Sequence, residues 1–185
     1  MNIPFVTKAD RIGMSWLPPQ FDGGSDVLDY KLWYDNASGG TTWTEVEAGI
    51  TVTSYTITGL TQGLTYQFKV QARNDYGFSD YSEPMSALAA QVPAQPQPPS
   101  TSFADGQVTI TWVAPDNGGS PIVAYTVVIQ TSDGTTYLEN TDYCDGSLAS
   151  VISSTTCIVP ALVLHEEPYG WPWASSITAQ VVASN

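Results

Sequence analysis

Basic residues are scarce in this 185-residue sequence, where five lysines and arginines stand against 18 acids and the net charge is −13. Nucleic acid is therefore an unsuitable partner, because binding it requires a cationic surface that neutralises phosphates. The basic residues are also unevenly distributed. Residues 93–185 contain eight acids but no lysine or arginine, so both residue types are confined to residues 1–92.

The sequence also lacks a run of 18 apolar residues, and we expect no part of this segment to be embedded in a membrane. Its single histidine, His165, has no nucleophile at a spacing that suggests catalysis, and the glycine pairs lie between strand-like segments rather than before a helix. These absences predict no catalytic activity and no cofactor. We also expect no metal centre, although Asp22, Asp26 and Asp29 leave a calcium site as an alternative without a dedicated loop spacing.

An internal repeat is present in place of these patterns. The stretch PQFDGGSDVLDYKLWY at 19–34 returns as PDNGGSPIVAYTVVIQ at 115–130, and each copy follows a strand-like segment that ends in Trp16 or Trp112. The repeat distance is 95 or 96 residues here, but it is 111 residues between YQFKVQARN and ITAQVVASN, which ends the sequence. The second copy therefore contains an insertion, which we place around residues 136–176.

The repeat predicts two modules joined by a linker. The stretch AAQVPAQPQPPS between the copies contains four prolines, which cannot supply the donors of a sheet ladder and which favour an extended, semi-rigid chain. We expect a first module over residues 1–92, a linker over 93–98 and a second module over 99–185.

Apolar side chains occur at every second position in the short segments of both halves, a pattern typical of half-buried strands. No segment shows a convincing helical period. About seven short strands in roughly 90 residues predict a β-sandwich, so the chain is expected to be all-β. The expected core residues are Trp16, Tyr30, Leu32, Tyr66, Phe68 and Val70 in the first module, and Trp112, Tyr125, Val127, Ile129, Ile177 and Ala179 in the second.

Two quoted patterns carry a resemblance to a known family. The first is W-x-P-P-x-x-D-G-G-S followed by a tyrosine, and the second is G-L-T-x-G-x-x-Y-x-F-x-V-x-A-x-N-x-x-G at residues 59–77. Together they resemble the fibronectin type III module, an immunoglobulin-like β-sandwich, closely over residues 4–90 and more loosely over 98–185. The resemblance implies that the first tryptophan fills the core and that Leu60, Gly63 and Tyr66 form a corner before the sixth strand.

The second module departs from this family pattern in two places. Ile177 stands where the first module has Tyr66, so we expect the stretch EEPYGWPWASS at 166–176 to rebuild the corner. The aromatic residues of this stretch are expected to cover the end of the sandwich, with a ligand platform as the alternative. Asn185 aligns with Asn74, so the second module lacks a counterpart of the last strand. Either a longer array continues the chain, or a partner strand completes the sandwich.

Both cysteines, Cys144 and Cys157, lie in the inserted segment. No histidine is close enough in sequence to suggest a metal site. We expect a disulfide that clips an inserted hairpin, with reduced core thiols as the alternative. A disulfide implies an oxidising compartment, and the glycosylation sequon at Asn36 agrees with it.

Alternation also predicts an exposed face on the first module. If Tyr30, Leu32 and Tyr34 point inward, then Lys31 and Trp33 point outward, and the next paired strand adds Lys69 and Arg73. A tryptophan flanked by cations is a candidate contact surface. One candidate partner is the second module of a neighbouring copy, which contains no lysine or arginine. The alternative is that Lys69 or Arg73 merely covers Trp33 by cation–π stacking.

The resemblance implies a non-catalytic role. We expect structural or adhesive spacer modules of a larger extracellular or cell-surface protein, with protein partners or neighbouring copies that assemble into an array or filament. A ligand-binding, receptor-type pair of ectodomains is one alternative. An intracellular filament scaffold is the other, because arrays of this module also occur inside muscle.

Overall fold

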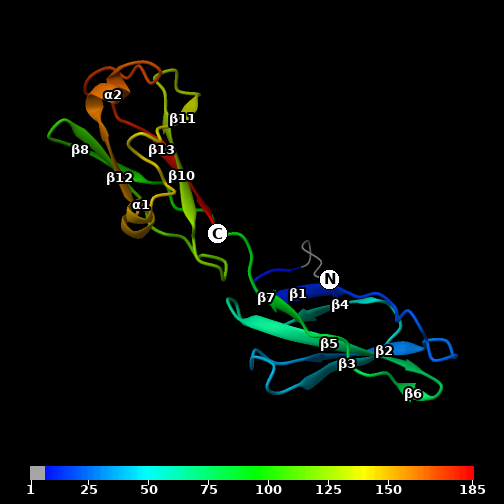
Figure 1. The fold of residues 1–185 in the computed structure, drawn as a ribbon. Coiled ribbons are helices and arrows are strands. Elements are labelled where there is room, and N and C mark those ends of the chain that lie inside the picture. The colour runs from blue at the N-terminus through cyan, green and yellow to red at the C-terminus, as the bar shows by residue number, and fades with distance from the viewer. Residues whose placement is uncertain (1–6) are drawn as a thin grey trace. The chain divides into compact units, whose positions relative to one another are not determined.

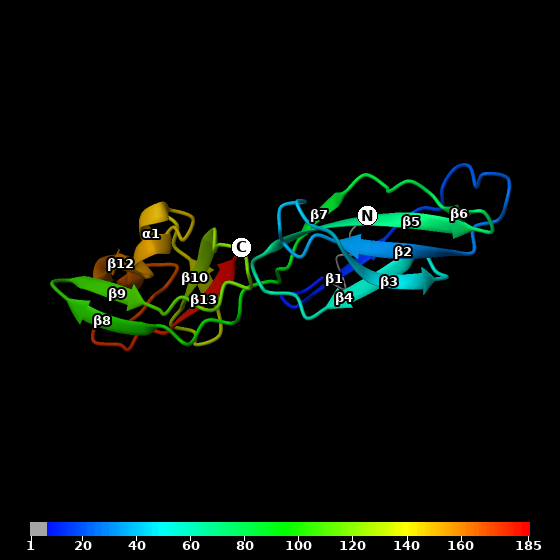
Figure 2. The same ribbon diagram turned by 90° about the horizontal axis from the view of Figure 1, so that it is seen from below.

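The computed structural model describes residues 7–185 and divides the chain into two compact units, Met1–Gln91 and Val92–Asn185. Figures 1 and 2 show that strands dominate both units. Within the described residues, no helix is both long enough and apolar enough to cross a bilayer. The expected all-β fold class is confirmed, apart from two short helices in the second unit.

The first unit is a sandwich of two antiparallel sheets. One sheet pairs β1 with β4, and the other has the order β3-β2-β5-β6, with β7 also paired to β5. The strands are β1 (Arg11–Ser15), β2 (Asp29–Tyr34), β3 (Thr44–Ile50), β4 (Ser54–Thr58), β5 (Thr65–Asn74), β6 (Gly77–Phe78) and β7 (Met85–Leu88).

The loop between β1 and β2 explains the first half of the repeated sequence. Gly23 and Gly24 have φ angles of 78° and 86°, a left-handed conformation that glycine adopts without steric cost. Asp22 stabilises the turn because its Oδ1 accepts a hydrogen bond of 2.8 Å from the Gly24 N–H. The loop carries the chain from one sheet to the other.

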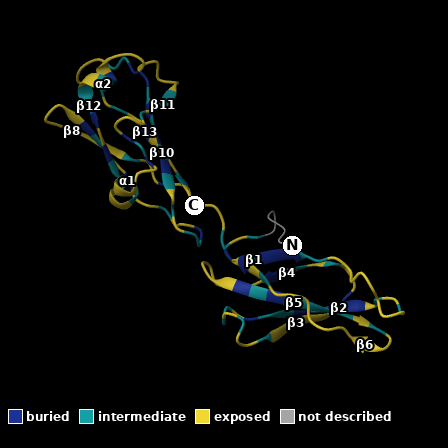
Figure 3. Cartoon of the chain, viewed as in Figure 1, coloured by how far each residue is buried: buried dark blue, intermediate teal, exposed yellow. Residues whose placement is uncertain are grey.

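Alternating side chains fill the core of the first unit, shown in dark blue in Figure 3. Tyr30, Leu32, Tyr66 and Phe68 are buried, whereas Trp16 is only half-buried and packs edge-on against Tyr30. The Tyr66 hydroxyl accepts a hydrogen bond of 2.9 Å from the Thr61 N–H, which is the expected corner geometry. Val70 also packs partly buried against this core.

The second unit is also a two-sheet sandwich. Its sheets have the orders β12-β9-β8 and β11-β10-β13. The elements are β8 (Ser100–Ala104), β9 (Gln107–Thr111), β10 (Ala124–Gln130), β11 (Tyr137–Glu139), α1 (Ala149–Ser154), β12 (Thr156–Pro160), α2 (Ala161–His165) and β13 (Ala179–Ser184).

Trp112, Tyr125, Val127, Ile129 and Ala179 are buried in the core of the second unit, and Ile177 packs against it partly exposed. Within the described residues β13 pairs only with β10, whereas its counterpart β5 pairs with β2 and also with β6 and β7. Among the described residues of the second unit no strand corresponds to β6 or β7, and a C-terminally incomplete second module stays a prediction.

Cys144 and Cys157 form the disulfide that the sequence predicts, with Cα atoms 5.2 Å apart. The predicted inserted hairpin is wrong, however. Cys157 lies on β12, which pairs with β9 just as β4 pairs with β1, so β12 is a strand of the sandwich itself. The bond therefore ties the loop after β11 to the sandwich core, where both cysteines are buried.

Candidate partner-binding face of the first module

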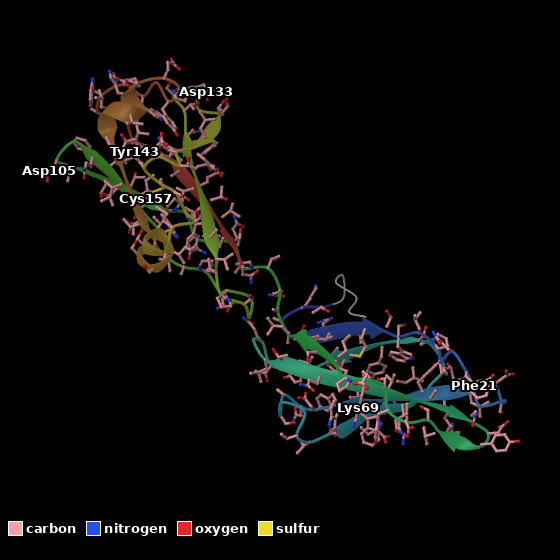
Figure 4. The ribbon with its side chains drawn as sticks, in the orientation of Figure 1. Phe21, Lys69, Asp105, Asp133, Tyr143 and Cys157 are labelled. Carbon is pink, nitrogen blue, oxygen red and sulfur yellow. A yellow bond between two sulfur atoms is a disulfide. The ribbon has the colours of Figure 1, made fainter. Side chains whose placement is uncertain are left out.

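The outward side chains of β2 and β5 lie opposite each other in the antiparallel ladder. Trp33 faces Lys69, and two residues earlier along β2 Lys31 faces Gln71. Because side chains of directly opposed residues lie on the same face of a sheet, Lys31, Trp33, Lys69 and Arg73 share the outer face of this sheet. Figure 4 labels Lys69 on this part of the first unit.

Strand β6, which ends at Phe78, and the segment that follows it add aromatic rings to this face, and two serines attach that segment to β5. The Ser79 and Ser82 hydroxyls accept hydrogen bonds of 3.0 Å each from the N–H groups of Ala72 and Val70 on β5. The two serine N–H groups donate in return to the carbonyls of the same β5 residues. Side-chain oxygens thus replace ladder carbonyls at a spacing of three residues, which places Phe78 and Tyr81 over β5.

Rings and cations alternate across the face. Lys31 Nζ lies 4.7 Å from the centroid of the Phe78 ring and 5.7 Å from that of Trp33. Trp33 meets Tyr81 edge to face at 5.9 Å. Lys69 Nζ then lies 3.7 Å from Tyr81 and 4.0 Å from the Trp43 ring. We call Trp33, Trp43, Phe78 and Tyr81, together with Lys31 and Lys69, the cation–aromatic ladder.

Acids and an amide complete the ladder. Lys31 Nζ is 3.0 Å from a Glu45 carboxylate oxygen, and the Trp33 ring N–H donates a bond of 3.1 Å to the Gln71 side chain. Arg73 forms a two-pronged ion pair with Asp29, and its guanidinium lies 5.8 Å from Phe78. The hydrogen bond from Arg73 holds the pKa of the Asp29 carboxyl below its usual value, although desolvation opposes this shift.

The structure corrects how the basic residues use this face. The sequence predicts that Lys69 or Arg73 covers Trp33, whereas in the structure Lys31 stacks on this ring. Lys69 instead stacks on Trp43 and Tyr81, and Arg73 on Phe78. Trp43, Phe78 and Tyr81 were missed entirely. The available signal was the stretch FSDYS at 78–82, in which an aromatic residue followed by serine recurs after three positions.

Asp35 organises the turn beyond β2 and is almost fully buried, with 1% of its surface exposed. Its two carboxylate oxygens accept hydrogen bonds from the backbone N–H groups of Ala37, Gly40 and Gln67, at 3.0, 2.9 and 2.8 Å. Burial alone raises the pKa of the Asp35 carboxyl, but the backbone donors outweigh burial and hold the pKa below its usual value.

Asn36, the glycosylation candidate, follows Asp35 in the same turn. Its side chain is exposed and its φ angle is 49°, a conformation that asparagine tolerates better than most residues. The acceptor position of the sequon therefore lies on an accessible turn.

The calcium alternative loses one of its ligands, because the Asp29 carboxylate is bound to Arg73. Asp22 is used within its own turn, as described above. Among residues 7–185, no group of three or more histidine, cysteine, aspartate or glutamate side chains is arranged to hold a metal ion.

His165 lies in the second unit, at the end of α2. Its ring stacks on Trp173 with centroids 4.4 Å apart, and its Nδ1 is 2.9 Å from the Trp171 carbonyl oxygen. Tyr169 is buried and donates to the Glu139 carbonyl, and the Trp171 ring N–H donates to the Gln130 carbonyl. Tyr169 and Trp171 thus close the end of the sandwich as expected, whereas Trp173 is 61% exposed.

Sequence comparison matches residues 2–87 to the profile described as "Fibronectin type III domain". The chain is 32% identical over 122 residues to "Kelch domain-containing protein SSO1033" from Saccharolobus solfataricus, covering 65% of this chain and 16% of that protein. It is 30% identical over 164 residues to "Protein sidekick-1" from Gallus gallus, covering 84% of this chain and 7% of that protein. The chain therefore spans less than a fifth of either relative.

Structure comparison finds domains A168–A170 of titin, with a TM-score of 0.42 and 31% sequence identity over 45% of this chain and 28% of the titin chain.

Proposed function

Because this chain belongs to the fibronectin type III family through residues 2–87, we propose that it is a non-catalytic pair of structural or adhesive spacer modules within a larger extracellular or cell-surface protein. Its partners would be other proteins, with neighbouring copies of the same protein as the alternative. The chain covers only a small part of its relatives, so the proposal concerns this segment.

The cation–aromatic ladder is the observation that carries the proposal. Lys31 and Lys69 each contact two rings, and Arg73 is paired with Asp29. A contact surface gains most from groups that find their first partner in the complex, whereas these cations already have partners within their own sheet. The ladder therefore supports a self-contained module more than a face that awaits a ligand.

The surroundings of His165 support the non-catalytic part of the proposal. Since the Trp171 carbonyl accepts the bond at Nδ1, the ring is held by a backbone group and by stacking on Trp173. A general base for a nucleophile is usually oriented toward that nucleophile by a third group. Among the described residues no nucleophilic side chain is hydrogen-bonded to His165, and its stacking on Trp173 helps to hold the segment after α2 in place.

We expect the disulfide to be present in the protein as it is made. The intact, never-reduced chain should be about 2 Da lighter than the reduced chain, because closing the bond removes two thiol hydrogens. Mass spectrometry measures this difference, and a further mass that disappears in Asn36→Gln would identify a glycan. Quantitative labelling of Cys144 and Cys157 in the native protein would contradict the extracellular assignment and favour the intracellular scaffold.

Self-association is a second testable point. The surplus of acid in residues 93–185 would favour a head-to-tail array only if the cations on the outer face of the first module were free to pair with it. Because the ladder cations are already paired, we expect the chain to sediment as a monomer at both low and high salt.

Sedimentation of the parent chain, Trp33→Ala and Arg73→Glu tests this expectation, with Lys8→Glu as a charge-matched control outside the ladder. An oligomer that weakens with salt and is lost in Trp33→Ala and Arg73→Glu, but not in Lys8→Glu, would establish the array alternative instead.

A further inference from the structure

A cleft of about 340 Å³ opens on the second module between β8 and the segment after α2. Its floor is formed by the buried side chains of Val108 and Leu164. Phe103 lines one side, and Trp171 and Trp173 line the other. The cleft is lined only by residues of this module, and its volume lies near the lower end of the range typical of small-molecule sites, about 300–1,000 Å³.

The walls of the cleft are held by hydrogen bonds. The Trp171 ring N–H is bonded to the Gln130 carbonyl at 2.6 Å, and its backbone N–H to the Leu164 carbonyl at 2.9 Å. Across the opening, the Thr101 hydroxyl donates to the Ile177 carbonyl at 3.0 Å. A cleft that is formed in advance costs little ordering when a ligand binds.

Large apolar rings in the walls are exposed to solvent. Trp173 is 61% exposed and Phe103 is 66% exposed, although both line the cleft. The other two aromatic side chains that close this end, Tyr169 and Trp171, have hydrogen-bond partners and are more deeply buried. Packing of the sandwich therefore accounts for Tyr169 and Trp171, but it leaves the exposure of Trp173 unexplained.

Uncommitted polar groups accompany the rings. Within the described residues the hydroxyls of Ser102 and Ser176 make no hydrogen bond, and both residues line the cleft. A carbonyl can only accept, so His165 must donate from Nδ1 to Trp171, and the neutral ring keeps Nε2 as an acceptor. The cleft thus offers two hydroxyls, each a donor and an acceptor, and one further acceptor.

Charge narrows the class of ligand. None of the residues that line the cleft is a lysine, arginine, aspartate or glutamate. An anion would meet no positive partner, since residues 93–185 contain eight acids and no lysine or arginine. A cation would be drawn to the module but would find no carboxylate in the cleft to pair with. An uncharged ligand fits the lining best.

We propose that this cleft binds a neutral saccharide. A sugar ring has an apolar face of C–H groups that suits an exposed tryptophan, and its edge carries hydroxyls that both donate and accept. Stacking on Trp173 would place the ring between the two walls, and Ser102, Ser176 and His165 would bind its hydroxyls. This function is separate from the spacer role, because it uses one end of the second module and none of the ladder.

A shallow site of this size holds one or two sugar rings, so we expect a dissociation constant of about 0.1–10 mM for a short oligosaccharide. The test uses the whole chain and four neutral probes: the hexasaccharides of β-1,4-glucose, β-1,3-glucose, β-1,4-mannose and β-1,4-N-acetylglucosamine. Saturation-transfer NMR and tryptophan fluorescence measure binding. Choline is a fifth probe, for an organic cation.

At least one hexasaccharide should bind, and Trp173→Ala should weaken that binding about ten-fold or more. Tyr143→Ala is the matched control, because Tyr143 is an exposed aromatic residue of the same module outside the cleft, and it should bind like the parent. Both variants should keep a melting temperature within about 2 °C of the parent, as expected for exposed side chains.

Three outcomes would overturn the proposal. The first is that none of the four hexasaccharides binds, and the second is that choline binds while the sugars do not. The third is that Trp173→Ala and the parent bind a sugar equally well. Since the spacer role makes no use of this cleft, each of these outcomes leaves the sedimentation and disulfide results unaffected.

Discussion

Replacement of Trp112 by alanine should strongly destabilise the second module and leave the stability of the first module unchanged. Trp112 is 3% exposed and packs edge-on against Tyr125 at 5.1 Å, so its removal leaves a large void in the core. We expect a loss of about 3–5 kcal/mol, which is a large part of the stability of a small domain. The Trp112 ring N–H has no hydrogen-bond partner among the described residues, so the loss comes from packing alone.

Denaturant unfolding followed by circular dichroism measures this effect, and Trp16→Ala and Trp173→Ala provide comparisons. Trp16 occupies the equivalent place in the first module but is only half-buried, so Trp16→Ala should cost less than Trp112→Ala. Trp173 is exposed, and its replacement should change the free energy of unfolding by less than about 0.5 kcal/mol. A Trp112→Ala chain that unfolds like the parent would refute the core assignment.

Asp35→Asn should destabilise the first module and remove part of its sensitivity to acid. Three backbone N–H groups point at the Asp35 carboxylate, and an asparagine side chain presents an NH₂ group to at least one of them. Because hydrogen bonds to a buried charge are the stronger kind, we expect a loss of about 2–4 kcal/mol at pH 7. Asp22→Asn is the control, since Asp22 makes one such bond on the surface.

The sign of the pH dependence follows from the lowered pKa of Asp35. A carboxyl whose pKa is lower in the folded state contributes stability above its unfolded pKa of about 3.9, and that contribution is lost as the pH falls through the folded value. The free energy of unfolding should therefore fall more steeply below about pH 4 in the parent than in Asp35→Asn. Parallel curves between pH 7 and pH 2.5 would contradict this assignment.

Alternation in the sequence was sufficient to predict the class of fold and most of the core. Tyr30, Leu32, Tyr66 and Phe68 are buried because each lies on the inner face of its strand, where apolar residues recur at every second position. The disulfide was also predictable, because the chain has only two cysteines. These features depend on the local pattern or on composition, and the sequence displays both directly.

The ladder was only partly predictable, because its partners come from segments without alternation. Trp43 lies just before β3, and Tyr81 lies in a segment that is bound to β5 through serine hydroxyls instead of regular strand pairing. Which ring meets which cation therefore depends on the bulged register of β3 and on those two serines. Asp35 was missed for a similar reason, since the donors that surround it come from its own turn and from distant β5.

The positions of the basic residues also affect how the chain meets a protease. Enzymes that cut after lysine or arginine have no site beyond Arg73, because residues 93–185 contain neither residue and none lies between 74 and 92. Between Arg11 and the end of the chain, the only such positions are the three basic residues of this face, which are held against rings or a carboxylate on paired strands. Trypsin cleavage at these positions requires the first module to open, so it reports the opening of that module and is silent on the second.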